Sequence, residues 1–261
     1  MLPMYFGAAQ RRLFGVYHPP SGGGDREEGV VLCYPSVQEY MRTHFAFRKL
    51  AGLLTQEGFH VLRFDYYGTG DSAGDIPDAT PAEWCANIRQ AAQELRDQAG
   101  ISRVSIVGLR MGALLAALAA TSDLDVRDLV LWEPAVDGVS HLHELRRIER
   151  RLLAHLRVQL RRPLRTGPNE LLGHPLSPEL ASAISALDLR QRPPCRADRV
   201  LIFGSQDRAD YRALSTALKD RRGQPAHYVI VPDETNSRAN TALLSTNILR
   251  AMASALARRA S

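Results

Sequence analysis

The sequence has few of the features that mark a secreted, membrane or cofactor-binding protein. Its three cysteines, among 261 residues, have neither disulfide-framework nor metal-site spacing. The longest apolar run, residues 113–120, is far shorter than the roughly 20 residues of a membrane span. Residues 1–12 lack the regions of a signal peptide, and Gly68, Gly70 and Gly74 lack dinucleotide-loop spacing. We therefore expect a cytoplasmic protein with no cofactor, no metal and no integral membrane segment.

Lysine is nearly absent, because only Lys49 and Lys219 of the 33 basic residues are lysines. The net charge of +5 is uneven, since residues 140–165 contain eight arginines and two glutamates. No zinc-knuckle, basic-zipper or RNP-type motif accompanies this charge, so we do not expect nucleic-acid binding. We expect a basic helix over residues 140–162 whose arginines face water. The alternative is a docking surface for an acidic partner, such as an acyl carrier protein, or for anionic lipid.

Strand and helix patterns alternate along most of the chain. Short apolar runs predict strands at residues 11–18 (an edge strand), 29–34, 59–64, 104–107, 128–132, 199–203 and 226–231. Helical spacing predicts helices at residues 43–56, 81–99, 209–221 and from about 240. This alternation predicts an α/β fold with a mostly parallel, doubly wound sheet. Residues 136–192 show helical spacing and no convincing strand, so we expect a helical cap inserted in a single domain, 1–261.

The stretch Gly108-Leu109-Arg110-Met111-Gly112 follows a buried strand and opens a helix of small apolar residues. Its pattern is that of the Gly-x-Ser-x-Gly nucleophile elbow, in which two glycines allow a tight turn and the middle residue is strained and exposed. Here the middle residue is Arg110, whose guanidinium is always charged and cannot act as a nucleophile. The sequence thus predicts the elbow without its usual chemistry.

Together with residues 58–72 and Gly204-Ser205-Gln206-Asp207, this elbow resembles the α/β-hydrolase superfamily, specifically the serine aminopeptidase (S33-type) branch. It also resembles a bacterial subgroup with Gly-Leu-Arg-x-Gly at the elbow. The resemblance implies an α/β-hydrolase fold and a Ser-His-Asp triad. Asp207 matches the acid position, with Asp210 as a less favoured substitute. No histidine follows His227, and residues around Asn236 occupy the place of the base.

Loss of the serine and the histidine together suggests that an ion pair replaces the triad. We expect Arg110 to pair with Asp207, or with Glu39 or Glu133, because an unpaired buried carboxylate is costly. Alternatively, Arg110 and the Met111 N–H form an anion site together with an N–H of the loop at residues 34–40. The candidate catalytic or degenerate-triad residues are Arg110, Asp207, Met111 and Ser36, and the candidate ligand-binding residues are Arg110, Met111, Ser36, Val37, Glu39 and Asn236.

Three functions remain open at this point. The favoured one is a non-classical member that cannot run triad hydrolysis and binds an acyl, ester or peptide-like ligand, or serves as a partner subunit. The second is a tailoring enzyme of cyclase, isomerase, epimerase or acyl-transfer type, in bacterial natural-product biosynthesis, that uses Arg110 and the oxyanion-hole amides. The third is a true hydrolase whose nucleophile has moved to Ser36 or Cys33, with His44 as the base.

Overall fold

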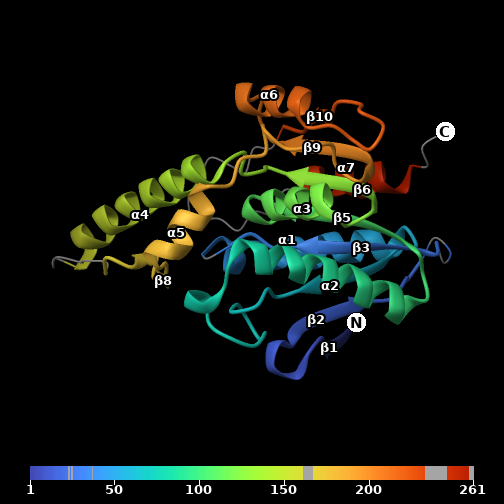
Figure 1. The fold of residues 1–261 in the computed structure, drawn as a ribbon, viewed down its shortest axis with the longest axis horizontal. Helices are drawn as coiled ribbons and strands as arrows, with labels where there is room; N and C mark the ends of the chain where they lie inside the picture. The colour runs from blue at the N-terminus through green and yellow to red at the C-terminus, as the bar shows by residue number, and fades with distance from the viewer. Residues whose placement is uncertain (23, 25, 37, 161–166, 233–245, 259–261) are drawn as a thin grey trace.

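The sheet is mostly parallel, as predicted, with helices on both faces (Figure 1). The computed structural model describes all residues except 23, 25, 37, 161–166, 233–245 and 259–261. Eight of its described strands form the main sheet, in the order β1-β2-β4-β3-β5-β6-β9-β10. The parallel strands are β3 (Glu28–Cys33), β4 (His60–Phe64), β5 (Arg103–Leu109), β6 (Val126–Trp132), β9 (Ala197–Gly204) and β10 (His227–Ile230).

The antiparallel edge of the sheet corrects one sequence prediction. We expected the strand before residue 19 to be the edge, but β2 (Leu13–His18) lies between β4 and β1 (Leu2–Phe6). Strand β1 pairs with β2 from Leu2 opposite Tyr17 to Phe6 opposite Leu13. It is short, mostly exposed and contains Pro3, which edge positions tolerate. Its sequence therefore carries little of the apolar pattern on which strand prediction depends.

Helices cover both faces of the sheet (Figure 1). Helix α2 (Pro81–Ala99) packs with α3 (Met111–Ser122) on one face, and α1 (Gln38–Gln56) packs with α7 (Thr246–Ala257) on the other. The predicted start of α2 is confirmed, because the Thr80 side chain accepts a hydrogen bond from the Glu83 N–H. The first ten residues of α3 are all buried, which explains their small apolar side chains. The shorter helices are α6 (Ala209–Ala217), η1 (Ala9–Arg11) and η2 (Ile76–Asp78).

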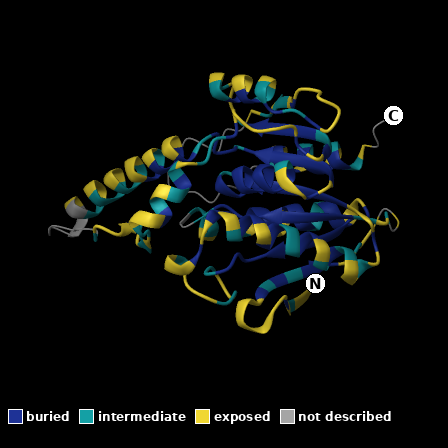
Figure 2. Ribbon diagram, viewed as in Figure 1, coloured by how far each residue is buried: buried dark blue, intermediate teal, exposed yellow. Residues whose placement is uncertain are grey.

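Between β6 and β9 the chain leaves the sheet and forms what we call the cap segment, residues 136–192. Its elements are α4 (Gly138–Leu160), β7 (Glu170–Leu171), β8 (His174–Pro175) and α5 (Pro178–Ser185). The two-residue hairpin of β7 and β8 was not expected from the sequence. One side of α4 is exposed along its length, and the helix extends away from the sheet (Figure 2). Within the described ranges, no helix has the length and apolar character needed to cross a membrane.

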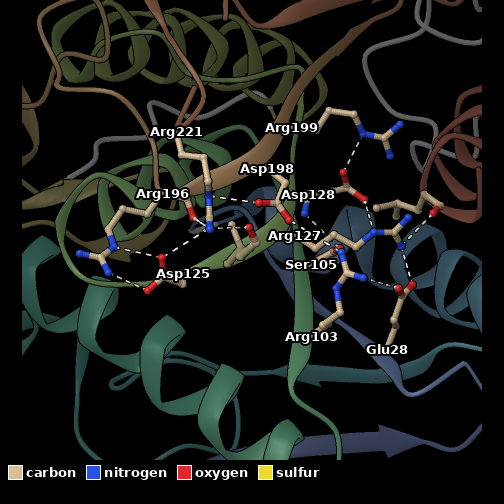
Figure 3. A network of polar contacts seen from close by, with 12 residues as sticks. Glu28, Arg103, Ser105, Asp125, Arg127, Asp128, Arg196, Asp198, Arg199 and Arg221 are labelled. Atoms are coloured by element: carbon tan, nitrogen blue, oxygen red, sulfur yellow. Dashed lines mark hydrogen bonds and ion pairs between the residues drawn. The ribbon is translucent and has the colours of Figure 1, made fainter. Parts of the chain in front are cut away.

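Arginines and carboxylates form a network at the amino ends of the parallel strands, the amino-edge network (Figure 3). Its charged members are Glu28, Arg103, Asp125, Arg127, Asp128, Arg196, Asp198, Arg199 and Arg221. Arg199 Nε lies 2.7 Å from Asp128 Oδ1, and the same guanidinium donates to the Ala255 carbonyl at 2.9 Å. Arg127 donates to the Leu256 carbonyl. The network thereby attaches the end of α7 to the sheet and complements its negative pole.

Candidate functional site

The elbow between β5 and α3 has the strained backbone that its sequence predicts. Arg110 has φ 55° and ψ −116°, a region that side-chain-bearing residues rarely adopt. Its N–H donates to the Trp132 carbonyl at 3.1 Å, which fixes this conformation against β6. A Cβ on Gly108 would lie 2.5 Å from the Gly112 carbonyl oxygen, and a Cβ on Gly112 would lie 2.3 Å from the Tyr34 carbonyl oxygen. Both glycines are therefore required for the close approach of strand and helix.

The Arg110 side chain lies between two carboxylates. Its Nε is 3.2 Å from Glu39 Oε1, and one terminal nitrogen donates to Glu144 Oε2. Glu39 belongs to the first turn of α1, and Glu144 belongs to α4. The two ion pairs of Arg110 therefore connect the elbow to α1 and to the cap segment. The Arg110 side chain is only 12% exposed. An ion pair therefore does occupy the elbow, with Glu39 as one of the three expected partners.

Burial and charge shift the pKa values of all three groups. Burial acts to lower the pKa of Arg110, but Glu39 and Glu144 outweigh it and raise that pKa. Burial raises the pKa of Glu39 despite the adjacent guanidinium. Burial also opposes ionisation of Glu144, but Arg110 holds the pKa of that carboxyl below its ordinary value. Two carboxylates already face the one guanidinium, so their combined negative charge disfavours an anionic ligand at Arg110.

The preferred partner, Asp207, is not at the elbow, and this prediction was wrong. Asp207 is 42% exposed and pairs instead with Arg212, whose Nε lies 2.7 Å from Asp207 Oδ1. Asp207 and Arg212 stand five residues apart, so the pairing is local and needs no site. The third expected partner, Glu133, accepts hydrogen bonds from the Ser205 N–H and hydroxyl at 2.6 Å and from Tyr211 at 3.1 Å. The substitute acid, Asp210, pairs with Arg208.

Two candidate ligand-binding residues, Val37 and Asn236, lie outside the described residues, as does the whole segment 233–245 that matches the base position. His227 is the first residue of β10 and is exposed. It therefore lies at the opposite end of that strand from the elbow edge. No described histidine takes the triad's place beside Asp207.

Two adjoining cavities lie between the carboxyl edge of the sheet and the cap segment. The larger, of about 140 Å³, is lined mainly by aromatic and apolar side chains. The smaller, of about 40 Å³, is lined largely by apolar residues of α4, α5 and the β7–β8 hairpin. The residues that line both are Ser36, Thr69, Ile76, Trp84 and Met111. We call the two together the cap cleft. Neither Arg110 nor Glu39 lines it, so within the described chain the ion pair lies behind the cleft wall.

Of the relocated-nucleophile candidates, Cys33 is fully buried in β3, and burial raises the pKa of its thiol far above the ordinary value. A buried thiol held protonated does not act as a nucleophile, which excludes Cys33. Ser36 lines both parts of the cap cleft. His44 stacks against the Tyr34 ring, and in the described structure no hydrogen bond joins it to Ser36. Burial and the nearby Arg63 lower its pKa.

Sequence reasoning missed two polar residues of the site, Glu144 and His141. Both belong to the first turns of α4, and His141 lines the smaller cavity. The available signal was their spacing, because residues three apart on a helix face the same side. Two buried apolar residues of this helix, Leu142 and Leu145, stand directly beside them in the sequence. Among the described residues, no three His, Cys, Asp or Glu side chains are grouped as a metal site would require.

The comparisons with known proteins agree on the fold. The sequence profile described as serine aminopeptidase, S33, matches residues 28–188. The structure is similar to Est1E of Butyrivibrio proteoclasticus with bound ferulic acid, at 18% identity, a TM-score of 0.65 and coverage of 97% of this chain and 96% of that one. It is similar to an α-β serine hydrolase homologue from Coxiella burnetii, at 13% identity, a TM-score of 0.59 and coverage of 100% and 97%.

A third similar structure is the bottromycin epimerase BotH in complex with bottromycin A2, at 17% identity, a TM-score of 0.59 and coverage of 98% of each chain. No curated protein matches the sequence. At these identities the structural likenesses establish the α/β-hydrolase fold, whereas the profile match extends over more than half of the chain. The elbow, the parallel sheet and this match together show that the chain belongs to the serine aminopeptidase S33 family of α/β-hydrolase-fold proteins.

Proposed function

We propose that this chain is a non-classical α/β-hydrolase-fold protein that does not hydrolyse through a Ser-His-Asp triad. In this proposal it binds a small acyl, ester or peptide-like ligand beneath residues 136–192, which act as a cap within a single domain. One observation carries the proposal: the elbow position holds Arg110, closed between Glu39 and Glu144, while Asp207 pairs with Arg212 in solvent. A triad needs two contacts, one between an acid and an imidazole and one between that imidazole and a hydroxyl, and the groups at the elbow make neither.

The cap cleft supports the ligand-binding part of the proposal. Its larger cavity of about 140 Å³ is predominantly apolar, with a few polar groups at its wall. Ligand sites commonly have this composition, because apolar walls supply burial and a few polar groups fix orientation. Trp84 lines both parts of the cleft, while the second tryptophan, Trp132, is buried in β6. Trp84 therefore offers a direct optical signal of occupancy.

The test combines labelling with turnover. A fluorophosphonate probe and a panel of short-chain esters and aminoacyl amides would be applied to the wild-type protein and to Ser36→Ala. We expect no site-specific labelling and no ester or amide turnover above that of Ser36→Ala. Labelling that disappears in Ser36→Ala would support the third hypothesis, hydrolysis through Ser36, and would overturn this proposal.

A second candidate is a tailoring enzyme of cyclase, isomerase, epimerase or acyl-transfer type in bacterial natural-product biosynthesis. The observation that favours it is the likeness to BotH, whose structure holds bottromycin A2. In this version the elbow guanidinium and the Met111 N–H would stabilise an oxyanion, and Arg110 would have to release Glu39 or Glu144 as the ligand enters. Turnover that is lost in Arg110→Ala and retained in Asp207→Ala would support this candidate over simple binding.

The proposal includes an acidic protein partner that binds the exposed arginines of α4. Arg146, Arg147, Arg150 and Arg151 are exposed on α4, whereas the side chain of Arg157 lies outside the description. An acidic protein, such as a carrier protein, would be attracted to this face, and the attraction would weaken as salt is raised. Replacing Arg150 and Arg151 by glutamate should abolish capture of an acyl carrier protein if this surface is used. The three cysteines are buried and free, in keeping with the proposed cytoplasmic location.

A further inference from the structure

The start of α4 places His141 against the cap cleft. The Asp137 side chain accepts a hydrogen bond from the Ser140 N–H at 2.7 Å, which caps the helix and fixes its first turn. His141 and Leu145 stand four residues apart on the inner side of α4, and both line the smaller cavity. Leu142, their neighbour, lines it as well. The ring is thus held at the cavity wall by a well-defined helix start.

The imidazole of His141 is buried but has no polar partner. The residue is 2% exposed, and neither Nδ1 nor Nε2 makes a hydrogen bond to any described group. Leaving buried donors and acceptors unpaired costs free energy, so such groups are rare and call for an explanation. The rest of the small cavity is largely apolar, including Met111, Leu180 and Ile184. The polar end of a ligand in the cleft could satisfy this ring.

The shape and charge of the cleft limit what that ligand can be. The larger cavity, of about 140 Å³, adjoins the one at His141, and an apolar cavity of about 150 Å³ holds one benzene ring. The charged groups that act on His141 are Arg110, Glu144 and Asp137, and Glu39 lies behind Arg110. Counted as ionised, these groups carry a net negative charge, which disfavours an anionic ligand. The fit is to an uncharged molecule with one ring or a short acyl chain and a polar end.

We propose that His141 is the polar anchor of the cap cleft, hydrogen bonding to the carbonyl of an uncharged ester, amide or ketone. The aryl or short alkyl part of that ligand then occupies the larger cavity beside Trp84. This inference rests on the cleft being the ligand site of the proposed function. It assigns the ligand class and a specificity-determining residue that lies outside the elbow.

The protonation state of the ring is consistent with this role. Burial, followed by the charge of Arg110, lowers the pKa of His141 to about 4. The ring is therefore neutral near pH 7, with one nitrogen donating and the other accepting. A neutral donor suits a carbonyl oxygen, and the remaining nitrogen can accept from an amide N–H or a hydroxyl of the same ligand.

A matched pair of probes tests the anchor. Acetophenone and α-methylstyrene have nearly the same shape, but only the first carries a carbonyl in place of an apolar CH₂ group. Binding of each would be followed by Trp84 fluorescence in a Trp132→Phe background. The raw affinities also include the cost of desolvating the carbonyl, so the measured quantity is the ratio of acetophenone to α-methylstyrene affinity in each variant. We expect this ratio to be about tenfold higher in the wild type than in His141→Phe, the effect of one good hydrogen bond in a buried site. His155→Phe, which replaces an exposed histidine of the same helix, should keep the wild-type ratio.

A second variant, His141→Gln, retains a hydrogen-bond donor and should keep part of the wild-type ratio of acetophenone to α-methylstyrene affinity. It also tests the anchor if His141→Phe does not fold. The imidazole nitrogen-15 signals of His141 can be assigned by their absence from the spectrum of His141→Gln. In the wild type, these signals should shift when acetophenone is added and should not shift when α-methylstyrene is added. The same affinity ratio in the wild type and in His141→Phe would overturn the anchor and leave the proposed cleft intact. Failure of both probes to bind would overturn the cleft as a ligand site as well.

Discussion

The amino ends and the carboxyl ends of the parallel strands, here the amino edge and the carboxyl edge, both carry clusters of arginines and carboxylates. The two clusters differ in how completely their polar groups are paired. In the amino-edge network, Arg127 and Arg199 each contact Asp128 and also donate to carbonyls at the end of α7 (Figure 3). At the carboxyl edge, Glu39 Oε2 and both ring nitrogens of His141 have no hydrogen-bond partner among the described groups. Charge that is paired across several elements stabilises the fold, whereas the unpaired imidazole of His141 beside the cap cleft is the group that we propose a ligand contacts.

Asp128 Oδ2 is the exception at the amino edge, because it makes no hydrogen bond. It lies 3.5 Å from Arg127 Nε, however, so the guanidinium still balances its charge. Asp128 is 1% exposed, and none of the amino-edge residues lines the cavities described above. The two unpaired carboxylate oxygens, of Asp128 and Glu39, therefore each belong to a group that faces an arginine, whereas the unpaired ring nitrogens of His141 belong to a residue that lines the cap cleft.

The largest expected effect comes from breaking the paired edge. Asp128→Ala removes a carboxylate that is 1% exposed and that contacts both Arg127 and Arg199, and it leaves the buried Arg127 with Glu28 alone. Removing one partner of a buried pair costs about 3–5 kcal/mol in unfolding free energy. Urea unfolding would measure it. The matched control, Asp125→Ala, removes the exposed partner of Arg196 and should cost less than about 1 kcal/mol. Equal effects of the two variants would show that the network is not stabilising through its buried member.

The next effect comes from removing the charge at the elbow. Arg110→Ala leaves Glu39 and Glu144 facing the same space, so we expect a loss of about 2–4 kcal/mol near pH 7. The backbone strain is unchanged, because alanine also carries a Cβ. Without Arg110, burial raises the pKa of Glu39 further. The variant then takes up a proton that the unfolded chain does not hold, so the loss should shrink as pH falls.

A double-mutant cycle isolates the elbow pair. Glu39→Gln in the Arg110→Ala background should recover much of the lost stability, because the remaining buried charge is removed. The unfolding free energies of the four proteins at pH 5 and pH 8 give the coupling and its pH dependence. A loss of stability in Arg110→Ala that is the same at both pH values, and unaffected by Glu39→Gln, would contradict the ion-pair account.

A smaller effect appears in acid at His141. The folded-state pKa of this ring is about 4 against 6.5 for an ordinary histidine, so below pH 6.5 the unfolded chain binds a proton that the folded protein excludes. Stability is then lost as pH falls from about 6.5 to 4, by about 2 kcal/mol at pH 5. His141→Phe should lack this loss, whereas His155→Phe should retain it. Unfolding free energies at pH 7 and pH 5 measure the difference, and equal slopes in all three proteins would place a charged ring in the folded state.

The sequence predicted the parts of this structure that depend on local patterns. The strained turn at Arg110, the cap of α2 at Thr80 and the alternation of strands and helices follow from glycine spacing, capping chemistry and apolar periodicity. The pairing of Arg110 does not, because Glu144 comes from a helix in an insertion whose orientation no local rule determines. Asp207 was wrongly chosen for a related reason. Asp207 follows β9, as the sequence predicts, but its side chain pairs with Arg212, five residues later in the chain.

The smallest expected effect concerns Asp207, and it separates an inherited position from a working one. If the triad acid still served the site, Asp207→Ala would weaken acetophenone binding in the cap cleft. Because its carboxylate is exposed and pairs locally with Arg212, we expect no measurable change in probe affinity or in the unfolding midpoint. The control is Glu133→Gln, which disturbs hydrogen bonds from Ser205 and Tyr211 and should cost about 1–3 kcal/mol. A binding defect in Asp207→Ala with Glu133→Gln unaffected would place the working acid after β9, and the elbow pair would then be only structural.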